Sequence, residues 1–407
     1  MATLHPFRAL RPRPDQASAV AAVPYDVVNA AEAQSLAEGN PLSFLRVSRP
    51  EIELPAGMDP YADAVYAAAV RNFARLRAAA PLVEEATPSV YVYRLRMGSH
   101  EQTGVAACFS VDEYESDVIR KHERTRKDKE DDRTRHIIDL RAQTGPVFLT
   151  YPASAEVDRA VAQSVSDPPL FDFTAVDDVR HTIWRAADAV ADVLVGAFAR
   201  VPLLYIADGH HRAASAMRAR QALRERTPAE GAMEADTFLA VAFPHDQTQI
   251  LPYHRVVKDL AGHTPASLLE ALAERVGVTP GSDTPGGHGE VAMYLAGRWY
   301  TLRLAPAAPG TPAADRLDVS LLHDQVLYPL LAVGDPRTDK RIDFIGGIRG
   351  PGALAERVDE GAAAVAFAMH QVSVEDLMRI ADSGGIMPPK STWFEPKLRD
   401  GLLTHLI

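Results

Sequence analysis

Residues 203–212 read Leu-Leu-Tyr-Ile-Ala-Asp-Gly-His-His-Arg, and this stretch decides the fold around it. The apolar run Leu203–Ile206 has the length and composition of a buried strand. Asp208 and Gly209 interrupt the run, and the alanine-rich stretch Ala213–Leu223 that follows predicts a helix. The sequence therefore predicts a strand, a tight glycine turn and a helix N-terminus.

A helix N-terminus behind a glycine turn suits an anion, because its free backbone N–H groups and the positive helix end favour phosphate. Four side chains add to this backbone site, those of Asp208, His210, His211 and Arg212. A guanidinium can bind phosphate oxygens in a bidentate manner, and imidazoles exchange protons near neutral pH. The alternative is a turn that only caps the helix, but a cap needs one polar side chain. We therefore expect a phosphate site here.

Length and composition bound the class of protein. A chain of 407 residues predicts two or three packed lobes. With 47% hydrophobic residues, 24% charged residues and a net charge of −11, the composition argues against a nucleic-acid partner. The single Cys108 excludes an internal disulfide and suits a reducing compartment. We see no signal-peptide core and no apolar run near the roughly 18 residues that span a bilayer, so we expect a cytoplasmic protein without a membrane partner.

Helix and strand candidates alternate irregularly, which favours a mixed α/β (α+β) architecture with several lobes. The patterns predict helices over residues 30–38, 61–76, 183–198 and 373–381. They predict strands over 90–95, 105–111, 146–151, 237–243, 250–257 and 364–369, and a hairpin over 291–304. A Pro- and Gly-rich loop at 280–290 suggests a boundary. We expect a main lobe over 1–280, with the His-Glu and Asp-Gly-His-His-Arg motifs, and a C-terminal lobe over 281–407, with the Lys-Ser-Thr segment.

A dense run of mixed charge covers residues 120–136, where His122 and Glu123 stand beside Arg126 and Lys127. This inventory suits phosphoryl transfer, because the carboxylate can position or deprotonate a hydroxyl while the cations offset charge on the transferring group. A solvated helix laced with salt bridges has the same composition. The residues leave both interpretations open.

Two further segments carry candidate ligands. Prolines stiffen the segment 387–397, which lowers the entropy cost of presenting its polar side chains, Lys390, Ser391, Thr392 and Lys397. A rigid surface tail is the alternative. His254 and Arg255 stand at the end of a predicted strand and are a weaker candidate pair, because a lone histidine at a strand end is commonly structural.

Standard fingerprints are absent from the sequence: we find no Walker A loop, dinucleotide-binding glycine motif, H-E-x-x-H or G-x-S-x-G. Zinc at His210, His211 and a carboxylate is disfavoured, since adjacent histidines on a tight turn usually point apart.

At these residues the chain resembles a large prokaryotic family catalogued as a domain of unknown function, DUF1015, over nearly its full length. The matching blocks are Pro6–Pro12, Pro24–Val28, Asn40–Val47, His122–Thr125, Ala207–Arg212, Leu251–Arg255 and Met387–Lys397. Where the family often has a bulky residue after the motif arginine, this chain has Ala213 and Ala214. We therefore expect no stacking role at these two positions.

The Asp-Gly-His-His-Arg turn alone is similar to the phosphate-binding turn of the ParB/sulfiredoxin superfamily. That superfamily includes nucleotide-hydrolysing partition proteins, sulfiredoxins that use ATP, and kinases acting on free serine. The resemblance implies a ParB/sulfiredoxin-like nucleotide-phosphate site at Gly209, His210, His211 and Arg212. Sulfiredoxin chemistry needs a cysteine in the motif, and His210 stands in the turn, so that branch does not fit.

The residues and the resemblance together predict a kinase that uses ATP or ADP with Mg²⁺ to phosphorylate a small hydroxyl compound such as free serine. We expect Glu123 as the base beside His122, and Asp208 as the metal ligand or as the residue that orients the turn. The charge on the transferring group would be offset by Arg126, Lys127, Lys390 or Lys397, with Ser391, Thr392, His254 and Arg255 as further cofactor contacts.

Two alternatives stay open. One is a ParB-like protein in which nucleotide binding or hydrolysis acts as a switch, although no DNA-binding module is evident. The other is a phosphate-ester hydrolase that uses the same pocket. The expected partners are a nucleotide and a small-molecule substrate, and a homodimer is also open.

Overall fold

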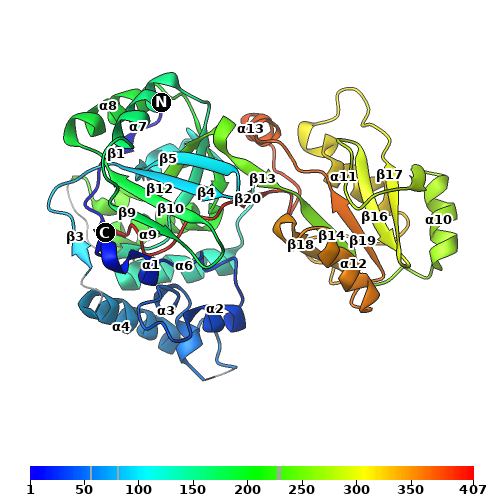
Figure 1. Cartoon of the computed structure of the whole chain (residues 1–407), viewed down its shortest axis with the longest axis horizontal. Helices are drawn as coiled ribbons and strands as arrows, with labels where there is room; N and C mark the ends of the chain where they lie inside the picture. The colour runs from blue at the N-terminus through cyan, green and yellow to red at the C-terminus, as the bar shows by residue number, and fades with distance from the viewer. Residues whose placement is uncertain (56, 80–81, 227–230) are drawn as a thin grey trace. The chain divides into compact units, whose positions relative to one another are not determined.

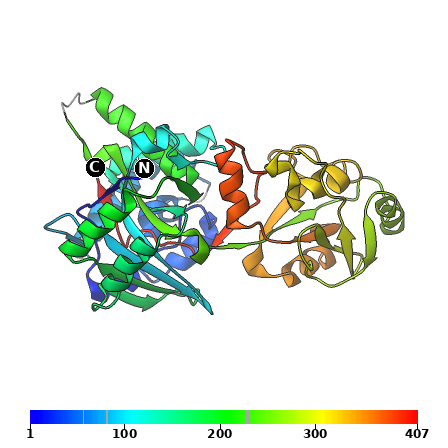
Figure 2. The same cartoon turned by 90° about the horizontal axis from the view of Figure 1, so that it is seen from above.

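A computed structural model describes residues 1–55, 57–79, 82–226 and 231–407 of the chain. The described residues form two compact units, unit 1 (Met1–Thr248 and Pro396–Ile407) and unit 2 (Gln249–Glu395). Both units combine helices with sheets, which confirms the predicted mixed α/β class (Figure 1). Both chain termini belong to unit 1 (Figure 2).

The division into units differs from the expected boundary near residue 280. Residues 249–280 belong to unit 2 because β14 (Tyr253–Val257) and β15 (Gly277–Pro280) pair with strands of that unit. The chain then returns to unit 1 at Pro396, where Ala22 and Asp400 exchange backbone hydrogen bonds. Neither the start of unit 2 at residue 249 nor the return to unit 1 at Pro396 follows from a Pro- and Gly-rich loop in the sequence. Both are determined by pairing between segments that are distant in the chain.

The main sheet of unit 1 has the strand order β6-β11-β8-β12-β5-β4-β10-β9, with β1 paired to β5. In sequence order its strands are β1 (Leu4–His5), β4 (Tyr91–Met97), β5 (His100–Ser110), β6 (Ile119–Arg120), β8 (Val147–Tyr151), β9 (Phe171–Thr174), β10 (Arg180–Arg185), β11 (Leu204–Asp208) and β12 (Thr237–Pro244). Two short pairs complete the unit, β2 (Leu10–Arg11) with β3 (Val83–Glu84) and β7 (Ala142–Gln143) with β21 (His405–Leu406). The central strand β12 is buried along nearly its whole length, as its unbroken apolar run predicts.

Helices of unit 1 pack around this sheet and on one another. They are α1 (Ala17–Val20), α2 (Ala30–Ala37), α3 (Leu45–Ser48), α4 (Asp63–Ala79), α5 (Val111–Glu115), α6 (Lys127–Leu140), α7 (Ala155–Ser164), α8 (Asp188–Phe198) and α9 (His210–Arg226). Helix α6 packs on α9, and α7 packs on α8 (Figure 1). Fully buried apolar side chains such as Leu194 and Ile206 fill the core, each contributing about 1.5–3 kcal/mol through its removal from water.

Unit 2 is built on a sheet of strand order β15-β17-β16-β19-β14-β18. The strands not yet given are β16 (Glu290–Leu295), β17 (Arg298–Arg303), β18 (Ile342–Gly346) and β19 (Val365–Met369), and a separate pair joins β13 (Gln249–Leu251) to β20 (Trp393–Glu395). Its helices are α10 (Pro265–Ala273), α11 (Asp318–Leu322), α12 (Gly352–Asp359) and α13 (Val374–Asp382). The predicted hairpin at 291–304 is confirmed as β16–β17, with positive φ at Ala296 and Gly297.

Two predicted elements were wrong in part. Residues 183–185 are the end of strand β10, where all three pair with β4 and Ile183 also pairs with β9, and the helix α8 begins only at Asp188. The run 250–257 is two strands, because Pro252 has no N–H to donate and separates β13 from β14. Among the described residues, no helix is both long and apolar enough to cross a membrane.

Candidate functional site

The predicted strand, turn and helix are confirmed at the end of β11. Asp208 ends the strand, Gly209 has φ +95°, and α9 begins at His210. The Gly209 N–H donates to Asp208 Oδ1 at 3.0 Å. A Cβ at position 209 would lie 3.2 Å from Arg212 Nη1, and the positive φ alone disfavours any residue with a side chain. The turn therefore requires glycine.

A lysine from the C-terminal segment meets this turn. Lys397 Nζ donates to Asp208 Oδ2 at 3.3 Å, and the two side chains are 12% and 29% exposed. Burial opposes ionisation of Asp208, but Lys397 and Arg212 outweigh it and lower the pKa of that carboxyl below its ordinary value. Asp208 is therefore a carboxylate throughout the neutral range.

The loop between β6 and α6 brings His122 and Glu123 to the same helix N-terminus. The His122 N–H donates to His210 Nε2 at 3.4 Å, and the two rings stand nearly perpendicular with centroids 4.4 Å apart. Glu123 Oε2 lies 3.8 Å from His210 Nδ1. Because His210 Nε2 accepts a hydrogen bond, the neutral ring carries its proton on Nδ1, which faces Glu123. Glu123 itself is about half exposed.

Both buried imidazoles of this cluster are neutral at physiological pH. Burial lowers the pKa of His122 to about 4, although Asp208 and the Ile206 backbone act in the opposite direction. Burial, reinforced by His122, holds the pKa of His210 well below its ordinary value. Neither ring nitrogen of His122 meets a hydrogen-bond partner with good geometry among the described residues. The cluster therefore adds polar groups to the site but no positive charge.

His211 contacts the start of α6, where the Arg126 N–H donates to His211 Nε2 at 3.0 Å. The side chains of Arg126 and Lys127 lie on the surface, paired with Asp128 at 2.7 Å and Asp131 at 2.8 Å. The salt-bridged-helix interpretation thus describes the run from Lys127 onward. His122 and Glu123 precede that helix and contact His210, beside the turn.

Arg212 makes contacts other than those expected of a free phosphate clamp. Its side chain is 8% exposed, and Nη2 donates to both carboxylate oxygens of Asp26 at 3.0 and 3.1 Å. Nη1 donates to the Pro146 carbonyl at 2.8 Å. Burial opposes the charge, yet Asp26 and Asp208 raise the pKa of Arg212 above its ordinary value. The guanidinium fork therefore holds Asp26 beside the turn.

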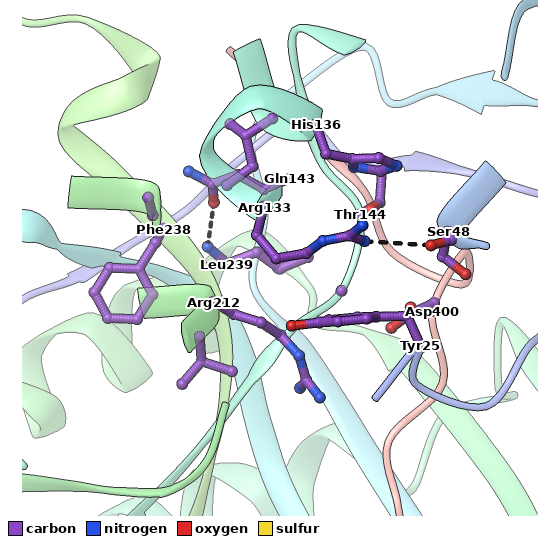
Figure 3. A pocket seen from close by; sticks show the side chains of 14 residues that line it. Tyr25, Ser48, Arg133, His136, Gln143, Thr144, Arg212, Phe238, Leu239 and Asp400 are labelled. Carbon is purple, nitrogen blue, oxygen red and sulfur yellow. Dashed lines mark hydrogen bonds between the residues drawn. The ribbon is translucent and has the colours of Figure 1, made fainter. Parts of the chain in front are cut away.

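A small cavity of about 40 Å³ lies behind Arg212, with room for about one water molecule. Figure 3 shows the Tyr25 ring between Arg133 and Arg212, whose guanidinium carbons lie 4.2 and 6.0 Å from the ring centroid. Asp400 also lines the cavity, and burial raises the pKa of this carboxyl to about 7 although Arg212 acts in the opposite direction. The cavity is too small for a nucleotide. The residues that line it instead support the turn from behind.

The remaining candidates belong to unit 2, where they bind its own backbone. Arg255, whose pKa burial lowers to about 10, donates to the carbonyls of Tyr253 and Lys390. His254, whose pKa burial lowers to about 4, accepts the Met369 N–H at 3.1 Å. Ser391 donates to Pro388 at 2.6 Å, and Thr392 is partly buried. Phosphate binding by these residues and by Lys390 stays a prediction.

Sequence reasoning assigned no role to Asp26, Tyr25 or Asp400. A signal existed for the first two, because the block Pro24–Val28 carries part of the family resemblance. No local pattern marks Asp400, which reaches the cavity through the return of the chain at Pro396. The carboxylates of Asp26, Asp208 and Glu123 are the oxygen ligands near the turn that suit Mg²⁺.

Comparison with solved structures gives distant likenesses. A conserved hypothetical protein from Pyrococcus furiosus is 14% identical with a TM-score of 0.34, covering 74% of this chain and 94% of that chain. A free serine kinase variant in complex with ADP is 13% identical with a TM-score of 0.34, covering 72% and 87%. SbnI with a C-terminal truncation, from Staphylococcus aureus, is 13% identical with a TM-score of 0.39, covering 74% and 87%. Likenesses at this level assign no activity.

No curated protein sequence matches the chain. The family model described as "Protein of unknown function (DUF1015)" matches residues 4–320, well over half of the chain. The protein therefore belongs to the DUF1015 family.

Proposed function

We propose that unit 1 is a nucleotide-dependent small-molecule kinase. It transfers a phosphoryl group from ATP or ADP, with Mg²⁺, to the hydroxyl of a small compound such as free serine. The observation that carries the proposal is the meeting of three distant chain segments at the N-terminus of α9. They contribute Glu123, the Asp208–Gly209 turn and Lys397.

Phosphate binding is assigned to the helix end and to Lys397. Helix α9 is 17 residues long, and the N–H groups of its first turn have no partner within the helix. Together with the positive helix end they form a site for phosphate oxygens. Since His122 and His210 are neutral and Arg212 is paired with Asp26, Lys397 is assigned to bind the phosphate oxygens.

Activation of the acceptor is assigned to Glu123. The acceptor oxygen forms a bond to the terminal phosphorus, and the bond from that phosphorus to the bridging oxygen breaks, leaving its electron pair on the nucleotide. The acceptor proton passes to the carboxylate of Glu123. His210 Nδ1, the protonated ring nitrogen, faces this carboxylate, with 3.8 Å between it and Glu123 Oε2.

A bound Mg²⁺ would neutralise charge on the phosphate oxygens. Asp208 fits this ion because its carboxyl stays ionised, and Asp26 is held near the turn by Arg212. When no Mg²⁺ is bound, the ammonium group of Lys397 offsets the negative charge of Asp208.

The acceptor is found by incubating the full chain with Mg²⁺, ATP or ADP, and L-serine, L-threonine, homoserine or glycerol, with products identified by mass spectrometry. A kinase forms, in each turnover, one phosphorylated acceptor and one nucleotide that has lost its terminal phosphate (ADP from ATP, or AMP from ADP). Release of phosphate from O-phosphoserine without nucleotide would instead support the hydrolase. Nucleotide hydrolysis without an acceptor, stimulated by duplex DNA, would support the ParB-like switch. Absence of phosphorylated product with every acceptor contradicts the proposal.

A further inference from the structure

Unit 2 contains a cluster of two imidazoles and a carboxylate, outside the proposed kinase site. His288 precedes β16, Asp318 is the first residue of α11, and His370 follows the last residue of β19. One potential ligand atom from each residue lies within 4.8 Å of the other two. Three segments separated in the chain thus present metal-ligating groups to one point.

The spacing fits a tetrahedral ion. His288 Nδ1 lies 3.6 Å from Asp318 Oδ2, and the rings of His288 and His370 have centroids 4.6 Å apart. Two ligands about 2.0–2.1 Å from a tetrahedral zinc ion are roughly 3.3 Å apart. The carboxylate and the first imidazole therefore need only a small adjustment to share one ion.

Hydrogen bonds behind the cluster orient two of the ligands. The Gly289 N–H donates to Asp318 Oδ1 at 2.9 Å, so Oδ2 is the oxygen turned to the cluster. His370 Nδ1 lies 3.0 Å from the Gln371 carbonyl, which places the ring proton on Nδ1 and leaves the lone pair of Nε2 for a ligand. Backbone partners of this kind commonly fix the tautomer and direction of metal ligands.

The comparable cluster in unit 1, His122, Glu123 and His210, lacks this arrangement. There His210 Nε2 accepts the His122 N–H, so the proton sits on Nδ1 and faces the Glu123 carboxylate. Neither ring nitrogen of His210 therefore offers a free lone pair to a metal ion, because Nε2 accepts a hydrogen bond and Nδ1 carries the proton. The unit 2 cluster is therefore the stronger metal site.

We infer that unit 2 binds one divalent transition-metal ion of the zinc class through His288, Asp318 and His370. Two imidazole nitrogens with one carboxylate oxygen favour Zn²⁺ over Mg²⁺ or Ca²⁺, which prefer all-oxygen sites. Three protein ligands leave one position open. A surface cavity lined by His288, Asp318 and Arg316 adjoins the cluster, so a water molecule or a small anion completes the coordination.

The ion would also join parts of unit 2. Asp318 is 8% exposed, and a bound cation neutralises this buried carboxylate. Because the three ligands come from the loop before β16, the start of α11 and the end of β19, binding holds these segments together. The site does not depend on the kinase activity proposed for unit 1.

The test is isothermal titration of Zn²⁺ into the full chain after chelator treatment, with the visible spectrum of bound Co²⁺ as a second readout. We expect one zinc ion per chain at this site. His370→Ala and His288→Ala remove a direct ligand and should weaken binding more than 100-fold, since loss of supporting groups alone costs about 10–100-fold. Asp318→Asn keeps the shape of the side chain and should abolish the Co²⁺ spectrum of the site.

His263→Ala is the matched control in the same unit, because His263 contacts Ser267 and lies outside the cluster. It should bind zinc as the wild type does. Circular dichroism confirms that each variant is folded, and zinc should raise the unfolding temperature only of chains with the intact site. The inference is overturned if the wild type binds no zinc. It is equally overturned if His370→Ala and His288→Ala keep the wild-type stoichiometry and affinity, which would place the ion elsewhere.

Discussion

Lys397 and Asp208 are separated by 189 residues in sequence, yet they form an ion pair at the N-terminus of α9, with 3.3 Å between Nζ and Oδ2. The pair links the returning C-terminal segment to the turn that we propose binds phosphate. It also explains why Asp208 keeps its charge in a buried setting, because Lys397 and Arg212 outweigh the effect of burial on its pKa. Lys397 and Arg212 together therefore keep the carboxylate of the turn ionised.

Lys397→Met removes that cation and leaves Asp208 without its ammonium partner. We predict a loss of about 1–3 kcal/mol in unfolding free energy, the usual effect of stranding a buried polar group, and weaker nucleotide binding. Urea denaturation and nucleotide titration measure the two effects. Lys127→Met is the control, because Lys127 is 83% exposed and its pair with Asp131 contributes little. Equal effects in both variants would contradict the role of Lys397.

Arg212→Ala leaves the partly exposed Asp26 without its guanidinium and the Pro146 carbonyl without its donor. We predict a loss of about 1–3 kcal/mol in unfolding free energy, the usual effect of leaving a polar group unpaired. Arg212→Lys keeps the charge but loses the bidentate geometry, so its loss should be smaller. A double-mutant cycle with Asp26→Asn tests the contact directly. Strictly additive effects of the two substitutions would show that the pair in the structure carries no coupling.

Asp400→Asn should change how stability depends on pH. Burial raises the pKa of Asp400 to about 7, so between about pH 4 and 7 the folded chain holds a proton that the unfolded chain releases. Wild-type stability from this group is present at low pH and falls as pH rises, by at most about 1.4 kcal/mol per pH unit. Asparagine does not ionise, so the Asp400→Asn variant does not lose stability in this way. Its unfolding free energy, relative to that of the wild type, should therefore rise from pH 4 to 7 and stay constant above pH 7, as measured by denaturation at each pH.

Gly209→Ala places a side chain at φ +95°, and we predict a loss of about 1–2 kcal/mol in unfolding free energy. The new Cβ also meets Arg212 Nη1 at 3.2 Å, so nucleotide binding should weaken. Gly196→Ala is the control, because Gly196 lies within α8 with no atom within 4 Å of a Cβ there. That variant should gain about 0.5–1 kcal/mol from better helix propensity. A Gly209→Ala variant as stable as Gly196→Ala would contradict the backbone argument.

Local signals predicted the part of the fold that local physics determines. The strand and helix around Gly209 follow from an apolar run, a residue with positive φ and an alanine-rich segment, and the helix after Ser373 follows from its N-cap. Residues 183–185 have side chains that suit either state, and pairing with β4 and β9 decides for strand. Pairing partners are distant in sequence, so a local pattern could not reveal them.

The site was predictable in its residue types more than in its contacts. Glu123, Asp208 and Lys397 were chosen for their chemistry, and the structure brings them to one helix end. The partner of Arg212 was missed because Asp26 lies 186 residues away, and a sequence does not show which anion a guanidinium will bind. Asp400 was missed for the same reason.

The most direct test of the proposed function compares Glu123→Gln with the wild type in phosphoryl transfer and in nucleotide binding. We predict that transfer to the acceptor falls by on the order of 10²–10⁴, the usual contribution of a general base, while the nucleotide Kd changes little. Glu225→Gln, at the exposed far end of α9, should transfer at the wild-type rate. If Glu123→Gln also transfers phosphoryl groups at the wild-type rate, Glu123 is not the base and the proposed mechanism is contradicted.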